Sequence, residues 1–256
     1  MKKIIYAAMA VVSMSYSAPA IAQSQDLQTK VNAYFTETLK AQQTVLEKAD
    51  REAFSQNKPS DTKLQLALKG KDVTGYQKMV WAAWCEANKS LKEEKLMKAE
   101  DLKLAKHSSW NIPACLEPDA VMPYYYGKKG VAADGKYPLF LYVHGSGPKD
   151  HEWENGIQLG LRFKDSPSIY FIPQIPNEGE YYRWWHLSKQ YAFEKLIRQS
   201  MVNGDVDANR LYVFGISEGG YGSQRLASFY ADYWAAAGPM AGGEPLKNAP
   251  VENCAN

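Results

Sequence analysis

The sequence contains few cysteines and histidines, and it carries almost no excess charge. Three cysteines and four histidines are spread over 256 residues, and no group of them has the spacing of a metal site. The 30 basic and 28 acidic side chains give a formal net charge of +2, so nothing favours nucleic acid or an anionic membrane as a partner. Internal repeats and low-complexity tracts are missing too. A hydrophobic content of 45% predicts an ordinary globular protein.

Long hydrophobic runs are also missing, and the apolar run near the N-terminus is too short to span a bilayer. Ile4–Val12 follows Lys2 and Lys3, and Ala20-Ile21-Ala22 has the small-x-small pattern that precedes a signal-peptidase site. We expect residues 1–22 to be a bacterial signal peptide, and the mature chain to be secreted or periplasmic with no attachment to the membrane. An uncleaved anchor is the alternative.

The three cysteines allow one disulfide within the chain if the protein enters an oxidising compartment. Cys85 and Cys115 are the more plausible pair. Cys254 lies close to the end of the sequence and has no clear partner, so the pairing stays open.

Residues 23–108 are predicted to form a helical N-terminal segment. Apolar residues recur every three to four positions over 27–49 and again over 73–84, which places them on one face of a helix in each stretch. Asn57–Asp61 interrupts the pattern, and Leu91–Lys106 is a third, heavily charged helix candidate. Such a segment either packs on the following domain as a cap or moves over it as a substrate lid, and the pattern leaves both open.

From residue 109 to residue 256, predicted strands and helices alternate. β-branched and aromatic residues become common, and short apolar runs suit strands that are buried on both faces. The expected strands are 121–126, 139–143, 168–172, 211–214 and 234–237, and the expected helices are 156–163, 187–201 and 220–230. This alternation predicts an α/β fold, with a mostly parallel sheet, flanking helices and right-handed crossovers.

One short stretch, Val213–Gly222, contains the pattern G-x-S-x-G around Ser217. It directly follows an apolar strand and directly precedes a helix, which is where a nucleophilic serine occupies a sharp turn. Ser217 is therefore predicted to stand at the carboxyl end of the sheet, where open α/β sheets place their ligand sites. The backbone N–H of Glu218 is the first donor expected for an oxyanion. A tight Gly-Ser turn without a catalytic role is the alternative.

A second glycine-rich turn, Val143–Pro148, follows the buried strand at 139–143 and reads VHGSGP. Hydrolases of this architecture need two backbone donors for the tetrahedral oxyanion, and a His-Gly-x-Gly turn after an earlier strand supplies the second. We assign this donor to the N–H of Ser146, with that of Gly145 as the near alternative. His144 stands at the strand end, where we expect it to brace the turn rather than to act as a base.

These two motifs resemble those of secreted bacterial esterases with the α/β-hydrolase fold, a group related to polyhydroxybutyrate depolymerases and to feruloyl and acetyl-xylan esterases. The matching stretches are PLFLYVHGSGP, VDANRLYVFGISEGGYGSQRLA and AAAGPMAGGEPL, so the resemblance covers residues 124–256. It implies a serine nucleophile, no cofactor, and an ester substrate that is a small molecule or is linked to a polysaccharide. The helical segment carries no motif that we can place.

The resemblance also implies the chain order serine, acid, histidine. After Ser217 the sequence has no histidine, and its only aspartate there is Asp232, on the helix expected after the serine. We therefore expect the triad acid and histidine beyond residue 256, in a domain that is incomplete on its C-terminal side, because ending at the last predicted strand leaves an apolar edge unpaired. The 256 residues alone are then expected to be inactive. A naturally shortened product is the alternative, and His186 is a candidate partner for Ser217 from upstream.

Three aromatic residues lie just before this histidine. Tyr182, Trp184 and Trp185 are expected either to line one wall of an acyl or sugar pocket or to pack between the helices and the sheet. The residues and the resemblance together predict a secreted serine hydrolase that cleaves carboxylic esters. A serine peptidase of the same fold and a binding protein without catalysis are the alternatives. The oligomeric state is not predicted.

Overall fold

The computed structural model describes residues 20–48, 70–104 and 106–243. Most of the predicted signal peptide lies outside these ranges, as does Cys254. The chain divides into two compact units between Glu93 and Glu94, whereas the sequence placed the boundary after residue 108. No helix in the described part of the chain is long and apolar enough to cross a membrane.

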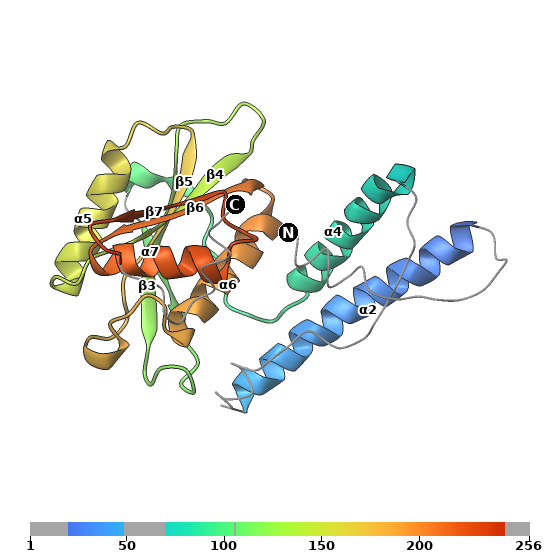
Figure 1. Ribbon diagram of the computed structural model, residues 1–256, viewed down its shortest axis with the longest axis horizontal. Coiled ribbons are helices and arrows are strands. Elements are labelled where there is room, and N and C mark those ends of the chain that lie inside the picture. Colours follow the sequence, from blue (N-terminus) through green and yellow to red (C-terminus); the bar gives the residue numbers. More distant parts are fainter. Residues whose placement is uncertain (1–19, 49–69, 105, 244–256) are drawn as a thin grey trace. The chain divides into compact units, whose positions relative to one another are not determined.

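Unit 1 contains two helices that pack on each other (Figure 1). They are α2 (Ala20–Glu47) and α4 (Val73–Lys89), the latter preceded by the short 3-10 helix η1 (Gly70–Asp72). The buried apolar residues recur at spacings of three to four: Val31, Phe35 and Leu39 on α2, and Val80, Ala83, Trp84 and Ala87 on α4. The predicted helical N-terminal segment is therefore confirmed, and its helices form because each has an apolar stripe to bury.

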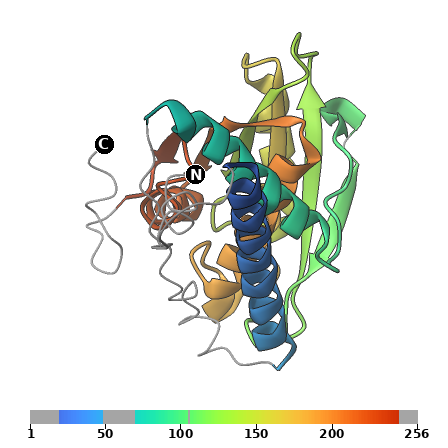
Figure 2. The same cartoon turned by 90° about the vertical axis from the view of Figure 1, so that its right-hand side faces the viewer.

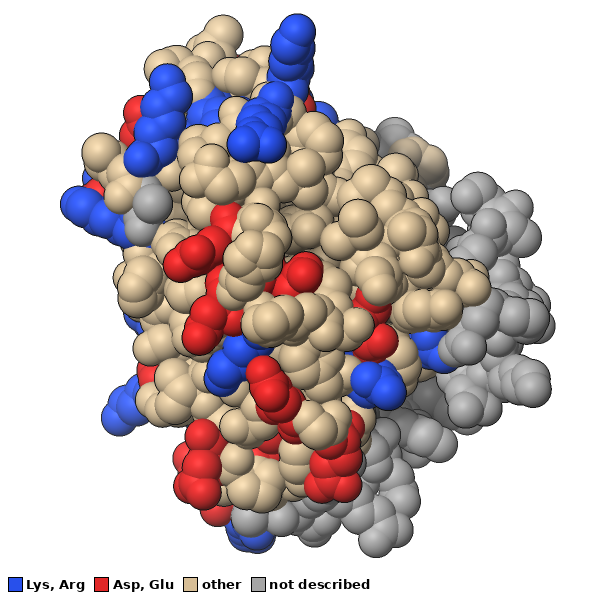
Figure 3. Space-filling view, turned by 90° about the vertical axis from the view of Figure 1, so that its left-hand side faces the viewer, with Lys and Arg blue, Asp and Glu red and all other residues tan. Residues whose placement is uncertain are grey.

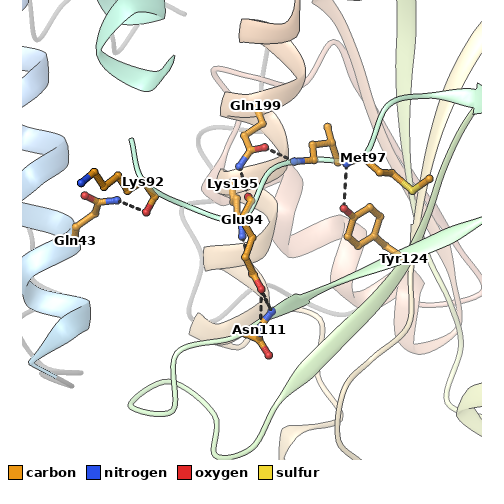
Figure 4. A network of polar contacts seen from close by, with 9 residues as sticks. Gln43, Lys92, Glu94, Met97, Asn111, Tyr124, Lys195 and Gln199 are labelled. Carbon is orange, nitrogen blue, oxygen red and sulfur yellow. Dashed lines mark hydrogen bonds and ion pairs between the residues drawn. The ribbon is translucent and has the colours of Figure 1, made fainter. Parts of the chain in front are cut away.

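The prediction of a third helix over residues 91–106 is wrong. In its described residues, 91–104 and 106, this stretch contains only the short strand β1 (Glu100–Asp101) and the 3-10 helix η2 (Leu102–Leu104). The N–H of Leu96 donates to the side chain of Gln199, and the N–H of Met97 donates to the hydroxyl of Tyr124 at 3.3 Å (Figure 4). These N–H groups are satisfied by side chains of unit 2, so the segment has no need of a helix to pair them.

In the described part of unit 2, seven strands form one open sheet in the order β1-β3-β5-β4-β6-β7, with β2 added on β3 (Figures 1 and 2). The remaining strands are β2 (His107–Asn111), β3 (Val121–Lys129), β4 (Tyr137–Val143), β5 (Ser168–Pro173), β6 (Val206–Ile216) and β7 (Ala236–Met240). β5, β4, β6 and β7 run parallel, and β3 is antiparallel to β5 and to β2. The α/β class with a mostly parallel sheet is confirmed.

Helices cover both faces of this sheet. They are α5 (Lys149–Arg162), α6 (Leu187–Asn203) and α7 (Glu218–Phe229), with the short η3 (Gly179–Tyr181) before α6. α5 lies on one face, because a Cβ on its Gly156 would press on Tyr142 of β4 and Ile172 of β5. α6 and α7 share the other face, because the Trp184 side chain contacts both Phe193 and Gly222.

The strand register brings two turns together at one edge of the sheet. Val143, the last residue of β4, pairs with Gly215 of β6, and Ile216 pairs with Met240 of β7. The turn that begins at His144 and the turn that contains Ser217 therefore leave neighbouring parallel strands at the same edge. This is the carboxyl edge, where open α/β sheets bind their ligands.

Candidate active site

Ser217 occupies the sharp turn between β6 and α7. Its backbone lies at φ 54° and ψ −115°, a conformation that residues with a side chain rarely adopt and that is held only when the surroundings enforce it. The Ser217 N–H donates to the carbonyl of Met240 at 2.9 Å, and the Ser217 carbonyl accepts from the N–H of Tyr221 at 3.0 Å. The side chain is exposed, so the turn presents the hydroxyl to solvent at the sheet edge.

Two glycines allow this turn to lie flat on β4. A Cβ on Gly215 or on Gly219 would collide with the carbonyl oxygen of Val143, and a Cβ on Gly219 would also come within 2.8 Å of the His144 carbonyl oxygen. Both obstacles are backbone atoms, which cannot rotate away. The G-x-S-x-G pattern is therefore a steric requirement of the close approach between β4 and the Ser217 turn.

The His144–Pro148 turn lies directly beside Ser217. A Cβ built on Gly145 would lie 3.6 Å from the Cβ of Ser217 and 3.1 Å from Oε2 of Glu152, a residue in the first turn of α5. The two sequence motifs, which are 70 residues apart, thus form one site. Glu152 closes this site on the α5 side.

Backbone donors gather at this site. Glu218 is the first residue of α7, so its N–H precedes any helical carbonyl to which it could donate. The N–H groups of Ser146 and Gly147 donate to no other residue in the described part of the chain. A helix N-terminus also favours negative charge, so the arrangement can stabilise an oxyanion formed on a substrate bound at Ser217.

His144 is buried and uses both ring nitrogens within the turn. Nδ1–H donates to the carbonyl of Gly145 at 2.7 Å, and Nε2 accepts the N–H of Ile175 at 3.1 Å. Burial lowers the pKa of His144 to about 4, although the hydrogen bond to Gly145 opposes the shift. A neutral ring with both nitrogens engaged braces the turn and has no nitrogen left for the proton of Ser217.

The three aromatic residues proposed as a pocket wall have different surroundings. Trp184 is 0% exposed and donates its Nε1–H to the His144 carbonyl at 2.8 Å, so its assignment to a substrate wall is corrected to the core. Tyr182 is 8% exposed and its hydroxyl points into the glycine-rich turn, so it is not an open wall either. Trp185 is half-buried, with the guanidinium of Arg225 4.0 Å above its ring. Only Trp185 keeps a surface that a substrate can touch.

The other histidines lie on separate elements. His186 precedes α6, and its ring lies 5.7 Å from that of Tyr181. His151 contacts Asn155 on α5, and His107 packs against aromatic rings near β3. No hydrogen bond in the described residues joins any of these rings to the Ser217 hydroxyl. Asp232, expected on the helix, lies in the turn after α7.

The face of the molecule that carries α5 shows acidic side chains gathered over its middle and lower part (Figure 3). Burial raises the pKa of Tyr182 to about 12, with further contributions from the nearby carboxylates of Glu152, Glu178 and Glu218. Arg183 lies 3.6 Å from Glu218. The surroundings of Tyr182 are therefore negative, and its hydroxyl keeps its proton.

The described residues contain neither a metal site nor a disulfide between Cys85 and Cys115. Within the residues that the structure describes, no three His, Cys, Asp or Glu side chains are grouped as a metal site. Of the described cysteines, Cys85 and Cys115 form no disulfide.

No protein-family model matches the chain, and no curated protein sequence matches it. Solved structures with a similar fold include a thermostable esterase, which is 24% identical with a TM-score of 0.45 and covers 58% of this chain and 43% of its own. An acetyl xylan esterase from Aspergillus awamori is 13% identical, with a TM-score of 0.39 and coverage of 52% and 50%. FphF, a fluorophosphonate-binding serine hydrolase of Staphylococcus aureus, is 12% identical, with a TM-score of 0.42 and coverage of 56% and 58%.

These structural neighbours are esterases and serine hydrolases. The chain spans about half the length of each of them. Similarity at this level does not extend to substrate or activity, which have to be inferred from the residues around Ser217.

Proposed function

We propose that this protein is a serine hydrolase of carboxylic esters, with Ser217 as the nucleophile and the N–H groups of Ser146 and Glu218 as the oxyanion hole. The observation that carries the proposal is the strained, exposed Ser217 beside the glycine-rich turn. A backbone at φ 54° and ψ −115° is costly to hold, and a serine that presents its hydroxyl at a helix N-terminus needs this turn.

The proposed chemistry has two steps. The Ser217 hydroxyl attacks the ester carbonyl carbon while its proton passes to a base. The tetrahedral oxyanion collapses, the alcohol leaves with that proton, and an acyl-serine remains. Water then attacks the acyl-serine through the same oxyanion geometry, which releases the carboxylic acid and returns the proton to Ser217.

The general base for this reaction is the one group that the described site residues do not supply. His144 is committed to the turn, and the described residues place no other histidine in hydrogen-bond contact with the Ser217 hydroxyl. We propose that the base is a histidine from outside these 256 residues. His186 is the alternative, in a site with an unusual order of residues. The predicted signal peptide makes export to the periplasm or the medium part of the proposal.

Fluorophosphonate labelling tests the nucleophile. The reagent should attach to Ser217, as located by peptide mass spectrometry, and Ser217→Ala should abolish the label. Ser223→Ala is the matched control, because that serine lies on the same helix and its hydroxyl already donates to the Gly220 carbonyl. If the folded wild-type chain remains unlabelled in the presence of added imidazole as a substitute base, the proposal is wrong.

The same experiment separates the two candidate bases. If the base is missing, added imidazole should accelerate labelling at least about tenfold, a modest part of what general-base catalysis contributes. His186→Ala should then change nothing. If His186 is the base, its loss should slow the reaction without imidazole, and added imidazole should restore the rate.

Trp185 is proposed as a wall of the substrate pocket. Its half-buried ring keeps some flat apolar area for an acyl or sugar group. Trp185→Ala should change the ratio of kcat/KM between an aromatic and a short-chain acyl ester about tenfold, the scale of lost apolar contacts in a pocket. An unchanged ratio with a lower melting temperature would assign Trp185 to packing alone.

A further inference from the structure

In the His144–Pro148 turn, the carbonyls bind side chains of the protein, whereas two of the N–H groups have no partner among the described residues. Three of its carbonyls lie within hydrogen-bond distance of side-chain donors. His144 O accepts from Trp184 Nε1 at 2.8 Å. Gly145 O accepts from the Tyr182 hydroxyl at 2.8 Å, and Gly147 O lies 3.1 Å from the same hydroxyl. Ser146 N–H and Gly147 N–H make no hydrogen bond to described residues.

This difference between carbonyls and N–H groups matters because a peptide group can rotate. In a glycine-rich turn, few side chains resist such a rotation. If the peptide between Gly145 and Ser146 turned over, the carbonyl of Gly145 would face the substrate and the N–H of Ser146 would face the interior. The oxyanion would then meet an acceptor in place of a donor, and stabilisation would be lost.

Two side chains oppose this rotation at the Gly145 carbonyl, the Tyr182 hydroxyl at 2.8 Å and the His144 Nδ1–H at 2.7 Å, and of these two the Tyr182 hydroxyl also reaches the Gly147 carbonyl. Its single proton is shared between the carbonyls on both sides of Ser146, at 2.8 Å from Gly145 O and 3.1 Å from Gly147 O, so the peptide group that carries the Ser146 N–H is held through the Gly145 carbonyl. Tyr182 is itself fixed, because it is buried and the neighbouring Trp184 is tied to the same turn. Its N–H also donates to the carbonyl of Gly179 at 3.1 Å.

We propose that Tyr182 is a positioning residue that sets the oxyanion hole by holding the Gly145 and Gly147 carbonyls away from the substrate. This inference rests on the proposed function of Ser217 and adds a residue that touches neither the substrate nor the nucleophile. The raised pKa of Tyr182, about 12, supports it, because the phenol then remains a donor throughout the working pH range.

Tyr182→Phe is the test, and Tyr181→Phe is its matched control. Both variants lose one phenolic oxygen from adjacent residues, but the Tyr181 hydroxyl makes no hydrogen bond to another described residue. The full chain is treated with a fluorophosphonate, with imidazole present for all variants, and the second-order rate of Ser217 labelling is measured together with the melting temperature. Phenylboronic acid affinity is measured in parallel, because its tetrahedral adduct on serine also places an oxygen in the oxyanion hole.

Tyr182→Phe is expected to slow labelling by about tenfold to a hundredfold, somewhat less than the loss of a whole oxyanion donor. Boronate affinity should fall in the same direction, whereas Tyr181→Phe should match wild type in both. The rates are taken below the melting temperature of the least stable variant, so partial unfolding does not contribute. A Tyr182→Phe protein that labels and binds like wild type overturns the inference while Ser217 stands. An unlabelled wild type overturns the proposed function itself.

Discussion

At the scale of the residue, the site depends on places where no side chain fits. Gly219 shows this most clearly, because a Cβ there would overlap the carbonyl of Val143, a fully buried residue at the end of β4. Ser217 can hold its unusual backbone angles only while α7 begins this close to β4. The glycine and the nucleophile are thus one structural unit, although only one of them takes part in chemistry.

Gly219→Ala is expected to destabilise unit 2 by at least about 2 kcal/mol, since a clash with backbone in a packed core forces the helix start to move. Labelling of Ser217 should fall with it. Urea unfolding gives the loss of stability. Gly243→Ala is the control, because an added Cβ there would lie 3.8 Å from Gln224 Oε1, an ordinary van der Waals contact. Equal effects of the two substitutions would show that the close approach to β4 is not what requires glycine.

At the scale of the element, α6 fixes the segment that enters unit 2. Gln199 accepts from the N–H of Leu96 and donates to the carbonyl of Glu94 at 2.9 Å. The Glu94 carboxylate in turn binds Lys195 and the side chain of Asn111 (Figure 4). One helix therefore supplies the hydrogen-bond partners for a segment about 100 residues earlier.

Gln199→Leu is expected to cost about 2 kcal/mol, because it leaves a buried N–H and a carbonyl of that segment without their partners. Amide exchange of residues 94–98 should become faster, and the urea midpoint should fall. Gln158→Leu, on the exposed side of α5, is the control and should leave both unchanged. Slow exchange in the Gln199 variant would mean that the segment is held by other contacts.

The same segment shows where prediction from sequence ends. Residues 91–106 have helical composition, but the partners of their backbone are Gln199 and Tyr124, which no local pattern can reveal. The strands at 139–143 and 168–172 were predictable because burial on both faces leaves a continuous apolar run. Ser217 was predictable from a strand, a motif and a helix in order. Tyr182 was placed near the site, but its contact with the glycine-rich turn could not be inferred, since it depends on tertiary packing.

At the scale of the whole molecule, unit 2 encloses several ionisable groups. Glu117 and Lys189 form an ion pair in which both side chains are 0% exposed. Burial lowers the pKa of Lys189, and Glu117 opposes that shift. His144 is buried, and neither of its ring nitrogens binds a carboxylate. Low pH is therefore expected to destabilise unit 2 through the same residue that braces the candidate oxyanion turn.

His144 makes the stability of unit 2 depend on pH in a defined window. Its pKa is about 4 in the folded protein and 6.5 in an ordinary environment, so between these values the unfolded chain binds a proton that the folded chain refuses. The contribution is complete above pH 6.5 and is lost as the pH falls towards 4, by about 3 kcal/mol in total. Urea unfolding at pH 5 should therefore show a lower stability than at pH 7.

An NMR titration checks directly that His144 is the cause: its imidazole chemical shift should remain that of the neutral ring from pH 8 to pH 5. His144→Gln should flatten the pH dependence between 6.5 and 5, whereas His151→Gln, on the exposed side of α5, should keep it. Because the folded-state ring stays neutral in this window, the turn should lose its brace only as the pH approaches 4. A His144 signal that titrates near pH 6.5 would show that the ring is open to solvent and that the turn is held without it.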